Sequence, residues 1–128
     1  WAIVAFLQKL PTYTPAAYQE LKAGKHDHAH AAFDEAPDPE RGRLAITQYA
    51  CITCHNIPGV VGPDAPVGPP LERIGTRAFL AGGLANTPQN MVRWLRSPQE
   101  VNPRSAMPDL GVTERDAQDI AAYLATLE

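Results

Sequence analysis

The chain carries the stretch CITCH at residues 51–55, and Cys51 and Cys54 are its only two cysteines. Cys-x-x-Cys followed directly by His is the attachment signature for haem of the c type. The two thiols add to vinyl groups on adjacent rings of the porphyrin, so one helical turn must separate them. His55 then points its imidazole at the iron. The stretch therefore predicts one haem c, held covalently by Cys51 and Cys54.

Two other sites use a Cys-x-x-Cys pair. A zinc site needs two further Cys or His ligands at ligand spacing, but the chain has no other Cys, and its remaining histidines, His26, His28 and His30, stand together in a different segment. A redox-active dithiol remains an alternative, although it does not need the adjacent His. The pentapeptide favours haem over both.

The sequence around the motif predicts an all-α fold with three main helices. Apolar spacing and capping residues predict helices at about 39–50, at 87–97 and from 113 onward, with a short helix near 76–81. No strand pattern is convincing, and two long stretches, 56–86 and 98–111, are irregular and rich in Pro or Gly. Loops of this length are unusual in a compact domain. We expect them to pack around something other than apolar side chains, which a haem would provide.

A second axial ligand for the iron is expected from one of the two methionines. Met91 falls inside the predicted helix 87–97 at core spacing with Trp94, which indicates packing. Met107 lies in an irregular stretch, NPRSAMPDLG, between two prolines that stiffen it. A thioether held in this way suits haem iron, and we predict Met107 as the ligand. The alternative for Met107 is a loop methionine that fills a gap.

The stretch VGPPL, residues 67–71, offers a partner for His55. A ligating histidine almost always donates its other ring N–H to an oxygen, which fixes its tautomer and orientation. A Pro-rich turn 14 positions after His55 is a good source of such a carbonyl.

Residues 38–128 resemble the class I cytochromes c, small monohaem electron carriers with His and Met ligands. The resemblance implies the class I cytochrome c fold, with three main helices and long loops around a covalently bound haem. The residues that carry it are Gly42 and Tyr49 before CITCH, Gly68-Pro69-Pro70-Leu71 after it, the run from Met91 to Met107, and Tyr123 in the last helix.

The resemblance also implies roles for residues beyond the attachment motif. Pro69 would supply the carbonyl to His55, and Arg77 would lie near a buried propionate. Trp94 would lie beside the haem near the methionine, and the Ser105 hydroxyl would contact a propionate or the Met sulfur. The alternatives are a solvated surface charge for Arg77, ordinary core packing for Trp94 and a turn residue for Ser105.

Composition divides the chain near residue 37, since all three Lys precede it and all eight Arg follow it. We interpret residues 1–24 as a helical remnant that resembles the end of a preceding cytochrome c domain, because IVAFLQKL near the start is similar to IAAYLATL at residues 120–127. Residues 25–37 would be a linker, and residues 38–128 would be the C-terminal haem domain of a dihaem protein. Chance similarity of two amphipathic helices and a trimmed membrane anchor are the alternatives.

These features together predict an electron-transfer protein rather than an enzyme. A haem with both axial positions filled has no open site for a substrate. Attachment through Cys-x-x-Cys-His implies assembly outside the cytoplasm, so a periplasmic location is expected. The partners would be a dehydrogenase, a quinol-oxidising complex, a terminal oxidase or another cytochrome, in a respiratory or dehydrogenase-linked chain. The residues after 37 contain no Lys, so the lysine ring that some class I members present to their partners is missing here.

Other functions are less consistent with the sequence. A net charge of −3 gives no reason to expect nucleic acid, and no apolar run approaches the roughly 20 residues of a transmembrane helix. A haem enzyme or gas-ligand sensor, in which Met107 dissociates, is the main alternative function. The alternating His26, His28 and His30 would also suit a copper, nickel or zinc site, although a soluble linker is the simpler explanation of this segment.

Overall fold

The computed structural model describes residues 36–64 and 67–128. These residues belong to the second of two units into which the chain divides, Ala36–Glu128. The predicted helices within 1–24, most of the predicted linker 25–37 and its three histidines lie outside the described residues.

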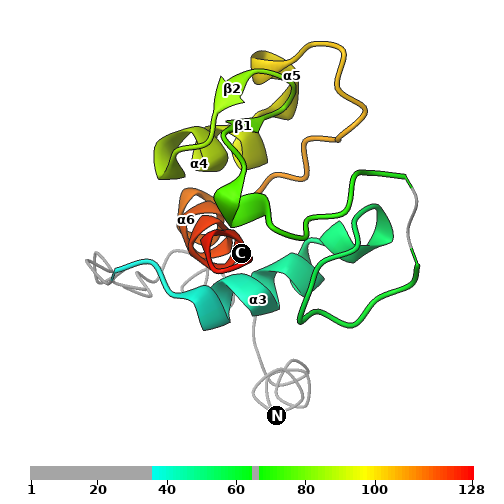
Figure 1. Ribbon diagram of the computed structural model, residues 1–128, viewed down its shortest axis with the longest axis vertical. Helices are drawn as coiled ribbons and strands as arrows, with labels where there is room; N and C mark the ends of the chain where they lie inside the picture. The colour runs from blue at the N-terminus through cyan, green and yellow to red at the C-terminus, as the bar shows by residue number, and fades with distance from the viewer. Residues whose placement is uncertain (1–35, 65–66) are drawn as a thin grey trace, which may run out of the picture. The chain divides into compact units, whose positions relative to one another are not determined.

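Three main helices build the described unit, as predicted (Figure 1). Each begins at a capping side chain, since Asp38, Thr87 and Thr113 accept hydrogen bonds from backbone N–H groups of the first turn. The helices are α3 (Pro39–Gln48), α4 (Pro88–Arg96) and α6 (Glu114–Ala125), joined by a short α5 (Pro98–Val101), two 3-10 turns, η2 (Cys51–Thr53) and η3 (Ile74–Thr76), and a hairpin of β1 (Phe79–Leu80) with β2 (Leu84–Ala85). None of the helices in this part of the chain is long and apolar enough to cross a membrane.

The prediction of a short helix near 76–81 is wrong, and so is the prediction that the domain has no strand. The chain forms η3 slightly earlier and then a two-stranded antiparallel hairpin, in which Phe79 pairs with Ala85. Two features of this segment explain the hairpin. Gly82 takes a positive φ of 86° at the tip of the hairpin, and the Asn86 amide donates to the carbonyls of Ile74 and Arg77 at 2.8 Å each. The Ile74 carbonyl also accepts from the Arg77 N–H at 3.3 Å at the end of η3, so the Asn86 amide adds a bond across the loop that holds the chain after η3 in the hairpin.

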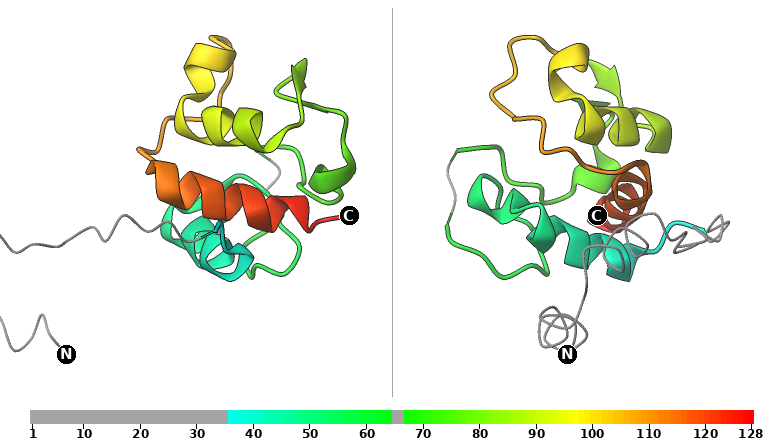
Figure 2. Two further views of the ribbon diagram at one scale, coloured as in Figure 1. Left: turned by 90° about the vertical axis from the view of Figure 1, so that its left-hand side faces the viewer. Right: turned by 180° about the vertical axis from the view of Figure 1, so that it is seen from behind.

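Helices α3 and α6 cross at close range (Figure 1, Figure 2). The crossing is set by Gly42, which has no side chain. A Cβ at this position would lie 2.0 Å from the backbone oxygen of Asp119 and 2.5 Å from its carbonyl carbon. Only glycine therefore allows the two helix backbones to touch at this point.

A buried carboxylate ties the same crossing together. Asp119 is 2% exposed and accepts from the Arg41 Nε at 2.8 Å and from the backbone N–H of Asp38 at 2.7 Å, while the Arg115 Nε lies 3.4 Å away. Burial alone would raise the pKa of Asp119, but the hydrogen bonds from Arg41 and Asp38 and the positive charge of Arg115 outweigh it and lower the pKa below its ordinary value. The ionised form thus joins α6 to the start of α3.

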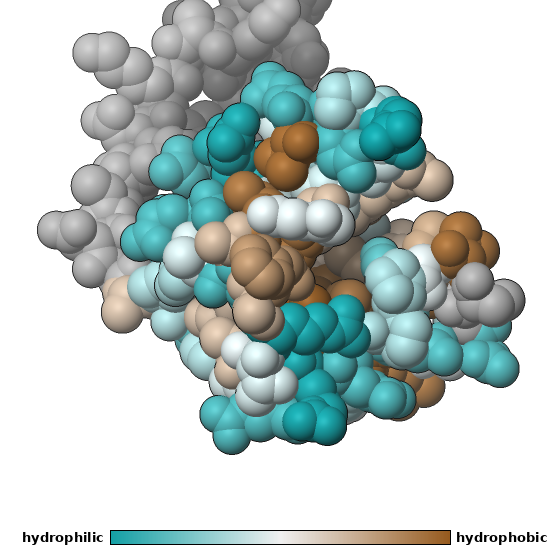
Figure 3. Space-filling model, turned by 45° about the horizontal axis from the view of Figure 1, so that its top comes forward, coloured by the Kyte–Doolittle hydropathy of each residue, from teal (hydrophilic) through white to brown (hydrophobic). Residues whose placement is uncertain are grey.

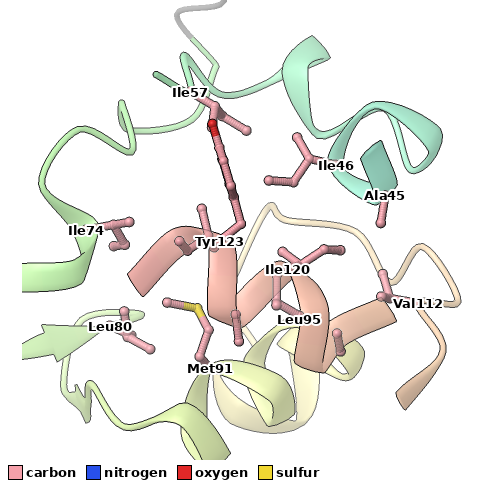
Figure 4. Packing of buried hydrophobic residues seen from close by; sticks show 13 residues of the cluster. Ala45, Ile46, Ile57, Ile74, Leu80, Met91, Leu95, Val112, Ile120 and Tyr123 are labelled. Atoms are coloured by element: carbon pink, nitrogen blue, oxygen red, sulfur yellow. The ribbon is translucent and has the colours of Figure 1, made fainter. Parts of the chain in front are cut away.

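The apolar core surrounds α6. Figure 4 shows Ile46 of α3 and Leu95 and Met91 of α4 meeting around Ile120 and Tyr123. Met91 is buried in this cluster, in agreement with the packing role that its spacing indicated. At the far side of the core the Tyr123 hydroxyl donates to the Pro58 carbonyl at 2.6 Å. The last helix is therefore both the centre of the core and an anchor for the long loop after CITCH.

Gly42→Ala tests the close crossing. We expect the free energy of unfolding to fall by about 1–3 kcal/mol, because the new methyl group must push α6 away. Guanidinium unfolding followed by helical circular dichroism measures it. Gly83→Ala is the matched control, because a Cβ there meets nothing within 4 Å. Equal stability of the two variants would contradict the role of Gly42.

Asp119→Asn tests the buried carboxylate. Removing the charge weakens the bonds from Arg41 and Asp38, but both arginines stay partly exposed and Arg41 keeps its pairing with Asp38. We therefore expect a loss of about 1.5–3 kcal/mol at pH 7. The folded pKa lies below the ordinary carboxyl value of about 3.9, so this contribution is complete above that value and is lost as pH falls through the folded pKa. The stability difference between wild type and variant should therefore shrink in acid. Glu100→Gln, at an exposed site, should show neither effect; a pH-independent difference for Asp119→Asn would contradict the assignment.

Candidate haem site

A cavity of about 720 Å³ opens between the helices and the long loops. Its volume falls in the range of about 300–1,000 Å³ that is typical of sites for small molecules and cofactors. Figure 3 shows this region as a recess with apolar residues at its opening. The structure brings together here every site residue predicted from the sequence: Cys51, Cys54, His55, Pro69, Arg77, Trp94, Ser105 and Met107 all line the cavity.

The attachment motif forms one tight turn at the end of α3. Ala50 adopts a left-handed conformation with φ of 54°, which redirects the chain into η2. The backbone N–H of His55 then donates to the Cys51 carbonyl at 3.0 Å, so Cys51 and His55 stand one helical turn apart. Burial raises the pKa of the Cys51 thiol, because its thiolate would lose hydration. The turn presents both thiols and the imidazole to the same cavity.

His55 is oriented by the loop that follows. Its Nδ1 lies 2.8 Å from the carbonyl oxygen of Pro69. Since a carbonyl only accepts, Nδ1 carries the proton and Nε2 keeps its lone pair for a metal. Gly68 allows this approach: its backbone N–H donates to the Cys54 carbonyl at 2.7 Å, and a Cβ there would lie 2.5 Å from the His55 Cε1. The loop and the imidazole therefore fix each other.

Arg77 holds the same loop from the other end. Its Nη2 donates to the carbonyls of Pro70 at 2.7 Å and Glu72 at 2.8 Å. Among the described residues that line the cavity, Arg77 is the only one with a charged Arg, Lys, Asp or Glu side chain. This position agrees with a role beside a cofactor carboxylate, and the structure adds a second role, because the guanidinium also ties the backbone that carries Pro69.

The remaining predicted residues come from α4 and the loop after α5. Trp94 is half-buried on α4, one turn after Met91. Met107 is half-buried and packs against the core cluster. The Ser105 hydroxyl accepts from the backbone N–H of Met107 at 3.1 Å, so its observed partner is the Met107 backbone. Sequence reasoning missed one contact in this region, the Gln99 amide that donates to the Met107 carbonyl at 2.5 Å. Nothing in the sequence singled out Gln99, apart from its place after Pro98 in the stretch that leads to Met107.

The donor set fits a haem of the c type. Two thiols stand at the attachment spacing, one imidazole nitrogen is available, and two thioethers, those of the buried Met91 and the half-buried Met107, line the same cavity, whose other walls are mainly apolar. A thioether and an imidazole are a known axial pair for haem iron in proteins. Within the part of the chain that the structure describes, no group of three or more His, Cys, Asp and Glu could hold a metal ion by itself.

The family model for cytochrome c matches residues 39–128. The chain belongs to the cytochrome c family. It is similar in structure to cytochrome c2 from Rhodobacter sphaeroides, with a TM-score of 0.55 and 26% sequence identity over 73% of this chain and 97% of that one. The fold is thus that of the class I cytochromes c, and electron transfer by a haem c protein is the function that this membership supports.

Two curated relatives share sequence with this chain. They are cytochrome c oxidase subunit 2 of Alkalihalophilus pseudofirmus, 33% identical over 89 residues, and cytochrome c oxidase subunit 2 of Bacillus sp. strain PS3, 31% identical over 88 residues. The matches cover 69% and 66% of this chain but only 25% of each relative. The chain therefore spans about a quarter of the length of these proteins.

Cys51→Ala and Cys54→Ala test the covalent attachment. Each single variant should keep one thioether bond and the double variant none, because each thiol saturates one vinyl group. The pyridine haemochrome spectrum reports the number of unsaturated vinyl groups. Thr53→Ala, which changes an exposed side chain inside the same motif, should keep the wild-type spectrum. A wild-type spectrum from either cysteine variant would show that its thiol is not a point of attachment.

Proposed function

We propose that residues 36–128 transfer single electrons through one haem c with His55 and Met107 as axial ligands. The observation that carries the proposal is the joint placement of the oriented His55 imidazole and the Met107 thioether in one cavity with both cysteines. The bound haem would supply one-electron chemistry at its iron. With both axial positions filled by the protein, substrate chemistry would have no open coordination site.

The contacts around the cavity favour electron transfer because they limit rearrangement. The loop that carries Pro69 is fixed by Arg77 and by Gly68, and the preceding loop is fixed by Tyr123. The Arg77 bonds close the loop on itself, whereas the Gly68 bond joins it to Cys54 and the Tyr123 bond joins the preceding loop to α6. A thioether ligand in an apolar surrounding favours ferrous iron and raises the reduction potential. We therefore propose an electron carrier, or an electron-carrying module of a larger oxidoreductase, and not an enzyme by itself.

The proposed partner is a terminal oxidase. The support is the similarity to two proteins named as cytochrome c oxidase subunit 2, which makes a place in a respiratory chain consistent with the chain's family. Because haem is attached through Cys-x-x-Cys-His, we propose a location outside the cytoplasm. The likeness of residues 3–10 to 120–127 supports a preceding haem domain, of which 1–24 would be the end.

Met107→Ala tests the ligand assignment and the function together. We expect the haem to stay attached, the near-infrared Met-to-iron charge-transfer band to disappear, and the reduction potential to fall. Absorption spectroscopy and a redox titration of the haem-loaded chain measure these changes. The reduced variant should also bind carbon monoxide readily, because its iron has lost a protein ligand, whereas the wild type should not.

Met91→Ala is the matched control. It removes the other thioether, at a buried site of the core, and should cost about 2–5 kcal/mol of stability while keeping the charge-transfer band. If the band is lost in Met91→Ala and kept in Met107→Ala, then Met91 is the axial ligand and Met107 is not. Rapid carbon monoxide binding by the wild type would favour a gas-binding haem over an electron carrier.

A further inference from the structure

The Met107 backbone is held on both sides by side chains instead of by regular secondary structure. Its N–H donates to the Ser105 hydroxyl at 3.1 Å, and its carbonyl accepts from the Gln99 Nε2 at 2.5 Å. Pro108 follows and has no N–H to add a further bond. Both backbone groups of Met107 therefore depend on a side chain from earlier in the same segment.

These two side chains differ in what they can fix. Ser105 is two residues from Met107 and moves with it, so its hydrogen bond shapes the turn locally. Gln99 is eight residues away on α5. Among the contacts described for this loop, the Gln99 bond is the one that ties the Met107 backbone to a helix.

The short helix α5, which carries Gln99, is held in place by burial and by backbone hydrogen bonds. Pro98, at its start, is fully buried, and the N–H of Ser97 donates to the Arg93 carbonyl at 3.0 Å, which joins the start of α5 to the end of α4. The N–H of Asn102 donates back to the Pro98 carbonyl at 2.9 Å. The backbone of Gln99 is thus fixed while its amide reaches out to the loop.

We propose that Gln99 positions Met107 for its bond to the haem iron, an inference that rests on the proposed function. A methionine has three rotatable side-chain bonds and adapts easily to different positions, so its backbone must be held for the sulfur to stay at one point. Without the Gln99 bond, the loop regains conformational freedom. The bond between the Met107 sulfur and the haem iron must then offset the entropy lost when the loop is ordered. Gln99 is a positioning residue, because it acts through Met107.

Gln99→Glu tests this role in the haem-loaded full chain at pH 7. The change keeps the size of the side chain but replaces the donating amide by an acceptor-only carboxylate. The probe is imidazole, which binds ferric iron only where it displaces the methionine. We expect imidazole to bind roughly two- to tenfold more tightly to the variant, the range that corresponds to the loss of one hydrogen bond. The near-infrared band should also disappear at a lower temperature than in the wild type.

Gln89→Glu is the matched control, since it makes the same substitution at an exposed position on α4, outside the segment that leads to Met107. Its imidazole affinity should equal that of the wild type. An unchanged affinity in Gln99→Glu would overturn the proposal, as would an equal increase in Gln89→Glu, which would assign the effect to charge alone. Unfolding also breaks the Gln99 bond, so global stability should fall by no more than about the same factor as the gain in imidazole affinity. A much larger fall in global stability would overturn the proposal, because the variant would then loosen the whole domain and not the Met107 loop alone.

Met107→Ala in the same titration separates this inference from the function on which it rests. If Met107→Ala binds imidazole much more tightly and Gln99→Glu does not, only the role of Gln99 is wrong. If Met107→Ala leaves the affinity unchanged, Met107 is not the ligand and both proposals are overturned.

Discussion

The close contact between α3 and α6 is the constraint on which the rest of this domain depends. Gly42 lets the two backbones touch at Asp119, and the ionised Asp119 then joins α6 to Arg41 and to the start of α3. This crossing fixes which way the neighbouring side chains point. Ile46 of α3 and Ile120 of α6 consequently serve both the buried core and the wall of the cavity. The cofactor site is therefore built directly upon the helix crossing.

The loops use a different principle, in which side chains bind loop carbonyls. His55 meets the Pro69 carbonyl, Arg77 those of Pro70 and Glu72, and Gln99 that of Met107. Long irregular segments leave backbone groups without the partners that helices and sheets provide, and such groups must be satisfied in another way. In the described part of the chain, no buried side-chain nitrogen or oxygen lacks a partner. The loops are ordered by specific contacts to other segments, so each also fixes part of the site.

The features that could be predicted from sequence are those whose chemistry is local. The spacing in CITCH, the prolines around Met107 and the helix caps each depend on a few consecutive residues, and the predicted helices, the attachment cysteines and the two expected ligands followed from them. The roles of Pro69, Arg77, Trp94 and Ser105 came from the resemblance to the class I cytochromes c. The features that could not be predicted depend on distant partners. From the sequence alone, Asp119 would be an ordinary exposed acid on a helix, and only the contact with α3 shows that it is buried and paired. Gln99 has no role that the sequence reveals, because its partner is the carbonyl of Met107, eight residues later. The hairpin replaced a predicted helix because the Asn86 amide bonds carbonyls that precede it by several residues.

The charges of the domain bear on how a partner would meet it. Residues 36–128 hold eight arginines and ten acidic residues, so their net charge is small and gives little long-range attraction. Among the described residues that line the cavity, the one charged side chain, Arg77, is bound to two carbonyls, and Val67, Phe79 and Leu110 contribute apolar groups. Electrostatic steering raises association rates mainly where one sign of charge gathers around a site. Recognition at this opening would instead depend on apolar contact and on the shape of the cavity rim.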